Sequence, residues 1–313
     1  MAHPRRFRFG VQLNQPYEGS SWTDSARELE SLGYSTLFVP DHVDSGYAPL
    51  AAMAAAAAAT TTLRVAPLVL ASDFRHPAMV GRELTTIDQL SGGRLEVGLG
   101  AGWKRVDYDQ SGIPMDRPGV RVDRMIEHAR VLKALFAGEA VDFTGDHYDI
   151  TGLVSTPPAH GPGGPPFIIG GGAPRVLRFA GEFADIVGVN PSIHSGEIDG
   201  DAARDAQADR IDQKVEWVRE GAGDRFDDLE LNAWVAAARF TDDPVGFADE
   251  VAPLFGAGSG EELLSSPMTL VGNVDSLTQE LNRRRDRWGY SYVVVPGDEA
   301  RVFAPLVAAL TGT

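Results

Sequence analysis

Apolar residues recur along this chain with two spacings that follow each other in turn. A two-residue alternation of apolar and polar positions, typical of a strand, is followed by apolar residues three or four positions apart, typical of an amphipathic helix. The predicted strands span residues 7–13, 36–39, 63–70, 95–99, 167–169, 186–189, 229–236 and 290–295. The predicted helices span residues 22–32, 49–59, 77–91, 120–136, 174–182, 205–220, 244–254 and 274–288.

This alternation predicts an α/β fold in the form of a parallel (β/α)8 TIM barrel. Right-handed crossovers place each helix outside the sheet, and the 313 residues exceed the roughly 250 that such a barrel needs. We expect one domain over residues 1–313, with insertions at the C-terminal mouth at about 137–166, 190–204 and 256–270. An open doubly wound sheet is the alternative arrangement.

The most regular pattern lies between Phe74 and Trp103. Pro77 suits the first turn of a helix, whose amide donors have no partner within the helix, and a buried stripe follows at i, i+4 and i+7. Gly92 or Gly93 ends the helix, because glycine adopts the left-handed conformation without steric cost. The stripe consists of Val80, Leu84 and Ile87.

The strand that follows this helix ends in glycines. Alternation with its apolar neighbours turns Glu96 toward the barrel interior, where we interpret it as a paired structural charge rather than a catalyst. Gly98, Gly100 and Gly102 bring no side chains to the barrel mouth. Either a ligand lies there, or the glycines allow the backbone to pack closely.

Composition narrows the function classes. The formal net charge of -16 argues against binding to nucleic acid, whose partners concentrate Lys and Arg. The absence of cysteine excludes disulfides and thiolate chemistry, so any redox reaction requires a bound cofactor. Residues 1–8 are basic without an apolar signal core, and no run of 18 apolar residues occurs, so we expect a cytoplasmic protein without a membrane partner.

Three consecutive glycines indicate a phosphate site. Gly170, Gly171 and Gly172 stand directly before a predicted helix, where free amides and the positive helix end favour an anion. Arg175 in the first turn adds a counter-charge. The alternative is that the glycines only form a tight turn.

Polar residues also follow the predicted strand ends. His42 comes after the second strand, where an imidazole can donate a hydrogen bond or pass a proton, and Asp41 can orient it. Gln12 and Asn14 end the first strand, where their amides reach a substrate or cofactor, or cap the chain. His160 and His194 lack a second ligand at metal spacing, so we predict rim positions and no metal site. Arg283, Arg284 and Arg285 are interpreted as a solvated helix face.

These motifs resemble the bacterial luciferase-like superfamily of barrel oxidoreductases over nearly the whole chain. The resemblance rests on residues 74–103, on Asp41-His42, and on residues 170–172 with Ala184-Asp185. Residues 190–192, 214–232 and 270–272 are most similar to members that use the deazaflavin coenzyme F420. The resemblance implies a hydride exchanged between that cofactor and a small organic substrate, in a homodimer. FMN is the alternative cofactor.

The resemblance also implies roles for individual residues. His42 contacts the cofactor or acts in catalysis, and the cofactor ring lies against Val69 and Leu70 beside a cis peptide bond at Leu68–Val69. Trp103 stands where sugar-phosphate dehydrogenases of the superfamily carry an acidic glutamate, so this chain does not resemble those enzymes. The predicted cofactor contacts are Asn14, Asp41, Val69, Leu70, Gly100, Ala101, Gly102, Gly170, Gly171, Gly172 and Arg175.

Catalytic roles are predicted for His42, Asp41 and Trp103, and substrate contacts for Gln12, Trp103, Tyr108 and Asn190. Trp103 either stacks on substrate or only packs in the wall. Asp107 and Tyr108 are interpreted as a solvated loop pair, with proton donation as the alternative.

Three functions follow from this pattern. The first is an F420-dependent oxidoreductase, in which the cofactor supplies the hydride chemistry and the protein supplies orientation and a proton. The second is an FMN-dependent monooxygenase that needs reduced flavin and molecular oxygen. The third is a barrel that binds a deazaflavin or flavin without turnover.

Overall fold

The computed structural model describes residues 5–193 and 195–313, and the chain divides into two compact units. We call the unit formed by Leu13–Glu30 and Thr36–Ile168 the N-unit, and the unit formed by Met1–Gln12, Ser31–Ser35 and Ile169–Thr313 the C-unit. In both units, strands that pair in parallel alternate with helices along the chain. The prediction of one domain with three insertions stays a prediction.

The N-unit contains two parallel strand pairs. β2 (Thr36–Val39) pairs with β3 (Arg64–Pro67), β4 (Leu70–Ala71) pairs with β5 (Val97–Gly100), and Val65 bridges to Leu95. The helices of this unit are α1 (Trp22–Ser31), α2 (Pro49–Ala59), α3 (Pro77–Ser91), α4 (Arg105–Ser111) and α5 (Pro118–Phe136). Ser21 caps the N-terminus of α1, because its hydroxyl accepts from the amide of Asp24.

Local chemistry explains the bounds of α3. Pro77 occupies its first turn, the His76 side chain accepts from the amide of Ala78, and Gly92 ends the helix at a φ of 67°. The predicted stripe of Val80, Leu84 and Ile87 is buried. Glu96 is also buried and lies 2.7 Å from the Arg64 guanidinium, as expected for a paired structural charge.

The predicted third strand is interrupted. Residues 63–70 form β3 and the start of β4, and the peptide bond Leu68–Val69 between them is cis, as predicted. The break turns the chain out of the β3 pairing before it resumes beside β5. A continuous strand was therefore the wrong prediction here.

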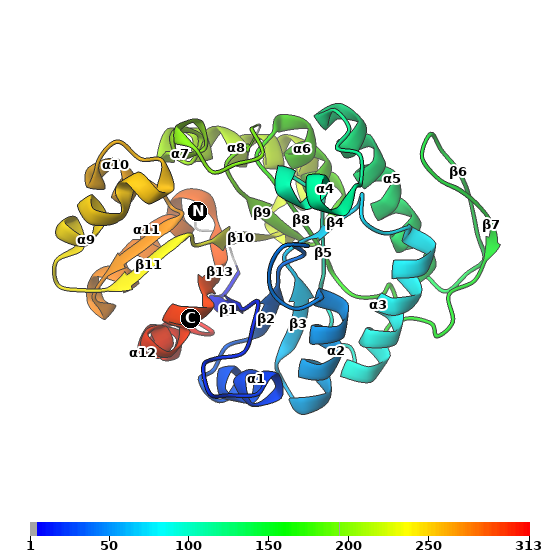
Figure 1. Cartoon of the computed structure of the whole chain (residues 1–313), viewed down its shortest axis with the longest axis horizontal. Coiled ribbons are helices and arrows are strands. Elements are labelled where there is room, and N and C mark those ends of the chain that lie inside the picture. The colour runs from blue at the N-terminus through cyan, green and yellow to red at the C-terminus, as the bar shows by residue number, and fades with distance from the viewer. Residues whose placement is uncertain (1–4, 194) are drawn as a thin grey trace. The chain divides into compact units, whose positions relative to one another are not determined.

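A hairpin follows α5, as the glycine at 145 predicts. Its strands β6 (Val141–Thr144) and β7 (Asp149–Leu153) are antiparallel, and Figure 1 shows them beside α5. The Glu127 carboxylate on α5 accepts hydrogen bonds from the amides of Asp146, His147 and Tyr148, which fixes the turn. Val131, Leu135, Val141 and Ile150 form the core beneath it.

Four strands of the C-unit form a parallel sheet in the order β1-β13-β10-β9. They are β1 (Arg8–Gln12), β13 (Tyr290–Pro296), β10 (Glu230–Trp234) and β9 (Ile186–Val189). β8 (Phe167–Gly171) ends beside β9, where the Asn190 amide donates to the Gly171 carbonyl. A separate parallel pair, β11 (Ala237–Phe240) with β12 (Thr269–Gly272), was not predicted.

The helices of the C-unit differ from the prediction at several places. They are α6 (Pro174–Phe183), α7 (Gly200–Asp205), α8 (Ala208–Ala222), α9 (Pro244–Val251), α10 (Gly260–Ser265), α11 (Val274–Trp288) and α12 (Ala300–Leu310), with short 3-10 turns η1 (Gly223–Asp228), η2 (Ala252–Phe255) and η3 (Gly297–Glu299). The predicted helix 205–220 corresponds to α8, whereas α7, α10 and α12 were missed.

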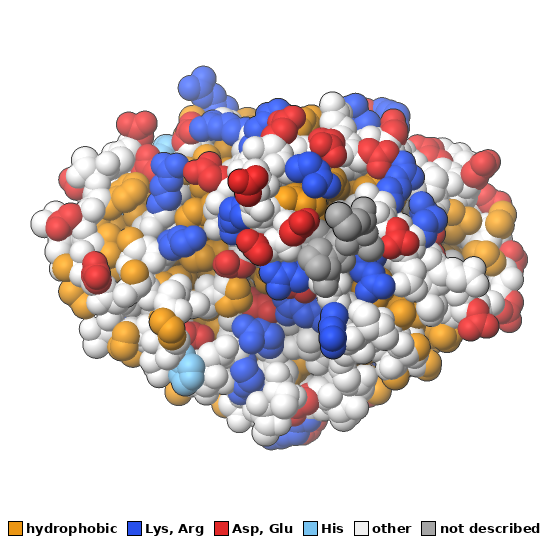
Figure 2. Space-filling model, turned by 180° about the vertical axis from the view of Figure 1, so that it is seen from behind, with side chains coloured by type: hydrophobic (Ala, Val, Ile, Leu, Met, Phe, Trp, Pro, Cys, Tyr) orange, Lys and Arg blue, Asp and Glu red, His pale blue; other side chains and the backbone are white. Residues whose placement is uncertain are grey.

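Arg284 corrects the interpretation of the arginine cluster on α11. Its side chain is buried and donates to the carbonyls of Pro267 (2.8 Å) and Thr269 (2.6 Å), which ties α11 to the start of β12. Arg283 beside it is exposed, as expected for a solvated face. Figure 2 shows acidic and basic side chains interspersed over one face of the molecule. In the described part of the chain, no helix is both long and apolar enough to span a bilayer.

Candidate functional site

His42 is held by a carboxylate from α4. The chain leaves β2 at Val39, and the His42 Nδ1 atom lies 2.7 Å from Oδ2 of Asp107. The other oxygen of Asp107 accepts from the amide of Val43 at 2.9 Å. Asp107 is only 3% exposed, so the prediction of a solvated loop pair was wrong. Its carboxylate instead fixes both the ring and the backbone of the loop after β2.

This contact determines which ring nitrogen faces outward. The carboxylate accepts a hydrogen bond from Nδ1–H, so the neutral His42 ring carries its lone pair on Nε2. Among residues 5–193 and 195–313, Nε2 has no hydrogen-bond partner, and the side chain is 24% exposed. The ring is therefore oriented and accessible, which are the two properties that a proton acceptor or donor needs.

Asp41 has a different partner from the predicted one. Its two oxygens accept from the Arg75 guanidinium at 2.6 and 2.9 Å, and one of them also accepts from the amide of Ala71. Asp41 therefore does not orient His42, because its oxygens are committed to Arg75 and to the start of β4. This ion pair also gives a structural role to Arg75 of the sequence block 74–77. The sequence did not predict the partner of Arg75.

Trp103 lies against His42. The two ring centroids are 5.8 Å apart with nearly perpendicular planes, and Trp103 is partly exposed. Gly102 precedes it with a φ of 73°, and a Cβ there would collide with the Tyr108 hydroxyl. Arg121 on α5 donates to the Gly102 carbonyl at 2.8 Å. The loop that presents Trp103 is thus held on both sides.

Tyr108 is buried rather than solvated. Its hydroxyl donates to Asp73 at 2.8 Å, and its ring contacts the edge of Phe74. Burial, assisted by the negative charge of Asp73, raises the pKa of the Tyr108 hydroxyl. At 1% exposure, Tyr108 supports the loop from behind, so its predicted contact with substrate gains no support from this position.

The glycines of β5 make room for the cis-linked segment. A Cβ on Gly98 would collide with the Pro67 carbonyl, and a Cβ on Gly100 would lie 2.7 Å from Cγ2 of Val69. Leu70 is buried, whereas Val69 is partly exposed. The geometry thus fits the close-packing alternative for Gly98 and Gly100. Contacts of Val69, Leu70, Gly100, Ala101 and Gly102 with a cofactor stay predictions.

A buried histidine lies behind this group. The structure buries Met125 and His128 on the inner side of α5. Nδ1 of His128 lies 3.3 Å from the Tyr148 hydroxyl, and its Nε2 is buried without a partner in the part of the chain described. Burial lowers the pKa of His128 to about 3, helped by the nearby charges of His76 and Arg75. Burial also raises the pKa of Tyr148 to about 12.

In the C-unit, Gly170 to Gly172 lead from β8 to the N-terminus of α6. The residue before α6, Ala173, has no side chain that caps it, so the first amides of the helix receive no side-chain acceptor. A Cβ on Gly172 would collide with the backbone of Asn190 and Ser192, so glycine is required by the loop that crosses it. Arg175 is exposed on the first turn.

A buried ion pair holds that crossing loop in place. Lys214 is 1% exposed, donates to the carbonyls of Asn190 (3.0 Å) and Asp205 (2.9 Å), and pairs with the Asp205 carboxylate. Burial lowers the pKa of Lys214, and the hydrogen bond to Asp205 opposes the shift. Asp205 also accepts from the amide of Ser192. The Oδ1 atom of Asn190 is buried and has no partner among the described residues.

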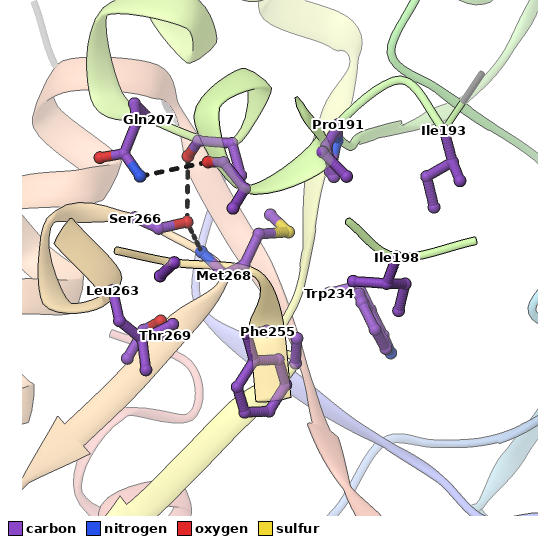
Figure 3. A pocket seen from close by; sticks show the side chains of 15 residues that line it. Pro191, Ile193, Ile198, Gln207, Trp234, Phe255, Leu263, Ser266, Met268 and Thr269 are labelled. Carbon is purple, nitrogen blue, oxygen red and sulfur yellow. Dashed lines mark hydrogen bonds between the residues drawn. The ribbon is translucent and has the colours of Figure 1, made fainter. Parts of the chain in front are cut away.

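Gln12 positions a tryptophan that was not predicted. Its side-chain oxygen accepts from the Trp234 indole at 2.8 Å, which joins the ends of β1 and β10. Trp234 lines a pocket of about 550 Å³ of empty space, open mouth included, together with Pro191, Phe255 and Met268 (Figure 3). The sequence signal for Trp234 was its place at the end of a predicted strand.

The remaining predicted residues lie apart from these groups. Asn14 is exposed, and its carbonyl accepts from the amide of Tyr47. His160 is exposed beside Gly93, which precedes β5, whereas the predicted mouth follows the other end of that strand, so its rim position gains no support, and His194 lies outside the described residues. Within the described ranges, no group of three His, Asp or Glu residues is arranged to hold a metal ion.

A family model described as luciferase-like monooxygenase matches residues 6–221. Among curated relatives, the F420-dependent glucose-6-phosphate dehydrogenase of Mycolicibacterium smegmatis is 27% identical over 335 aligned positions, which cover 95% of this chain and 96% of that protein.

Two solved structures have the same fold. The coenzyme F420-dependent tetrahydromethanopterin reductase of Methanopyrus kandleri aligns with a TM-score of 0.75 at 18% identity and covers 97% of this chain and 99% of its own. A monooxygenase from Streptomyces bottropensis aligns with a TM-score of 0.73 at 20% identity and covers 97% and 98%. The predicted α/β barrel fold is confirmed.

Proposed function

Because this chain belongs to the luciferase-like monooxygenase family, we propose that it is a coenzyme F420-dependent oxidoreductase that exchanges a hydride with a small organic substrate. The choice of F420 rests on the relative that covers 95% of the chain and carries F420 dependence in its name. The observation that carries the catalytic part is the His42 ring, which Asp107 orients at 2.7 Å with Nε2 accessible.

The residues of the C-unit fit a phosphate-bearing cofactor. The first turn of α6 has amides without a side-chain cap, and the buried Oδ1 of Asn190 accepts no hydrogen bond from described residues. We propose that Gly172 and the α6 N-terminus hold the phosphate, with Arg175 as a counter-charge. Asn190 would accept a hydrogen bond from a polar group of the cofactor or substrate.

The protein then supplies a proton path. When bound, the deazaflavin accepts or returns a hydride, which carries two electrons. A substrate that gives up a hydride from carbon also loses a proton from its oxygen, and in our proposal Nε2 of His42 takes that proton. The Asp107 carboxylate stabilises the imidazolium that forms. In the reverse direction the same atom returns the proton.

The departure at Trp103 argues against a sugar phosphate as substrate. An indole lies beside His42 at the position where sugar-phosphate dehydrogenases of the superfamily carry a glutamate, so an acidic group is absent there and an apolar wall is present. The relative's substrate, glucose 6-phosphate, is therefore not proposed for this chain. His42 is the proton acceptor in our proposal because no carboxylate occupies the position of Trp103.

Cofactor titration tests the proposal against its main alternative. FMN is the second candidate, because the resemblance to luciferase-like enzymes leaves it open as the alternative cofactor. We would titrate the protein with F420 and with FMN and follow tryptophan fluorescence. Binding of F420 at least tenfold tighter than FMN is expected. Tight FMN binding without a response to F420 would replace our proposal with a flavin-dependent monooxygenase.

We also propose that the protein is a cytoplasmic homodimer, on the basis of the family resemblance. Light scattering after size exclusion would check the dimer, with twice the chain mass as the expected result.

A further inference from the structure

The pocket of Figure 3 is apolar on almost every side. Ile193, Ile198 and Trp234 approach it from one side, and Phe255, Leu263 and Met268 from the other. Among the described residues, no charged side chain lines it. We call it the apolar pocket.

The few polar groups of the apolar pocket are mostly engaged. Gln207 donates to the carbonyls of Ala203 and Glu262, and the Ser266 hydroxyl donates to the Ala206 carbonyl and accepts from the amide of Met268. Thr269 differs, because its side chain is 2% exposed and its hydroxyl has no partner in the described chain. A buried hydroxyl without a partner costs free energy, so a ligand group that pairs with it is favoured.

The apolar pocket lies close to the proposed phosphate site. Pro191 comes from the loop that follows β9, and Trp234 ends β10, so the pocket lies at the C-terminal ends of parallel strands. In barrel enzymes these ends carry the active site. Pro191 is also part of the loop that crosses Gly172, next to the proposed phosphate site.

We propose that the apolar pocket binds the hydrocarbon body of an uncharged organic substrate, with the Thr269 hydroxyl bonded to one polar atom of it. This inference rests on the proposed function for the reaction itself. A sugar phosphate or another anion is excluded from the pocket, because transfer of a charge to an apolar site without a cation is strongly unfavourable. An uncharged ketone or alcohol with a long or cyclic hydrocarbon part has the required chemistry.

The test first measures binding to the protein without cofactor. The probe is N-phenyl-1-naphthylamine, an uncharged dye that fluoresces in apolar surroundings. Saturable binding to the natural protein is expected, and Ile193→Lys should weaken it at least tenfold by placing a charge in the pocket. Leu254→Lys is the matched control. Leu254 directly precedes the pocket residue Phe255, is 77% exposed and does not line the pocket. Its affinity should not change.

The second measurement uses displacement of the dye by 2-butanone, 2-hexanone and 2-octanone. Affinity should rise about fourfold with each added methylene, the ratio that corresponds to about 0.8 kcal/mol. Glucose 6-phosphate should not displace the dye. Thr269→Val should weaken the binding of 2-octanone roughly two- to tenfold, which corresponds to the loss of one hydrogen bond. The affinity for toluene, which cannot form that hydrogen bond, should not change.

Three outcomes would overturn the inference. They are dye binding that Ile193→Lys does not affect, displacement by glucose 6-phosphate, and ketone affinity independent of chain length. If Ile193→Lys does not fold, Ala203→Phe fills the pocket without a charge and should weaken the dye likewise. F420 affinity is measured separately on the same proteins. Failure of the natural protein to bind F420 would contradict the proposed function, whereas failure of the natural protein to bind the dye would contradict the pocket.

Discussion

The polar group around His42 in the N-unit and the apolar pocket in the C-unit are built in opposite ways. Around His42, charged side chains are matched in pairs, Asp107 with the imidazole and Asp41 with Arg75. In the apolar pocket, alanine, aromatic and branched side chains form most of the walls, and no described residue brings a charge. Under our two proposals, the group around His42 moves a proton and the apolar pocket binds the substrate.

The division follows from desolvation. A charged group near a reaction centre must keep its partner, since an unpaired buried charge costs more free energy than the pair gains. An apolar wall has no such requirement and gains affinity from area alone. Single substitutions around His42 should therefore change the reaction rate, and single substitutions in the apolar pocket should change the binding affinity.

His42→Ala should have the largest effect. Removal of the proton acceptor is expected to lower kcat by about 10²- to 10⁴-fold, the usual contribution of general acid-base catalysis. Steady-state kinetics with F420 and an identified substrate would measure it, and His160→Ala is the control because His160 is exposed. Full activity of His42→Ala would remove this ring from the mechanism. No turnover by the natural protein with any substrate would favour a barrel that only binds the cofactor.

Asp107→Asn should have the next largest effect. The amide keeps the shape but loses the charge that stabilises the imidazolium and fixes the tautomer. We expect kcat to fall roughly 10- to 100-fold, with a shifted pH profile and little change in KM. Asp109→Asn, an exposed residue on the same helix, should act like the natural protein. Equal kinetics for both variants would contradict the role of Asp107.

His128 should make the N-unit sensitive to acid. Its pKa of about 3 in the folded state lies below the ordinary value of 6.5, so the unfolded chain binds a proton that the folded chain excludes. The associated stability is complete above pH 6.5 and is lost as the pH falls from there toward 3, by about 1.4 kcal/mol per pH unit.

Urea unfolding at pH 6.5 and 5.5 would measure this slope. His128→Gln and His128→Phe should both show a shallower loss of unfolding free energy over the same interval. Slopes equal to that of the natural protein in both variants would show that other groups cause the acid sensitivity.

Gln12→Met should have the smallest effect and should touch only binding. It removes the acceptor of the Trp234 indole, which is worth about 0.5–1.5 kcal/mol. We expect KM to rise roughly two- to tenfold with kcat nearly unchanged. A fall in kcat with constant KM would place Gln12 with the chemistry and break the proposed division.

Local patterns in the chain were sufficient for most elements. The bounds predicted for β2, α2, β9 and α11 agree with the structure, because strand and helix periods and their proline or glycine ends are encoded within a few residues. The inner face of α5 was harder, since Arg121 and His128 are buried only because the Gly102 carbonyl and the Tyr148 hydroxyl approach them. A polar residue at the edge of an apolar stripe looks solvated in the sequence.

The sequence by itself determined the barrel fold and the strand ends with His42 and Gly172, and the absence of cysteine determined that any redox reaction requires a bound cofactor. Only the tertiary structure decided the partners. Asp41 pairs with Arg75 and His42 with Asp107 across 34 and 65 residues, and the apolar pocket joins residues 191 to 269. Such pairings depend on which chain segments meet in space, and periodicity along the chain does not encode that.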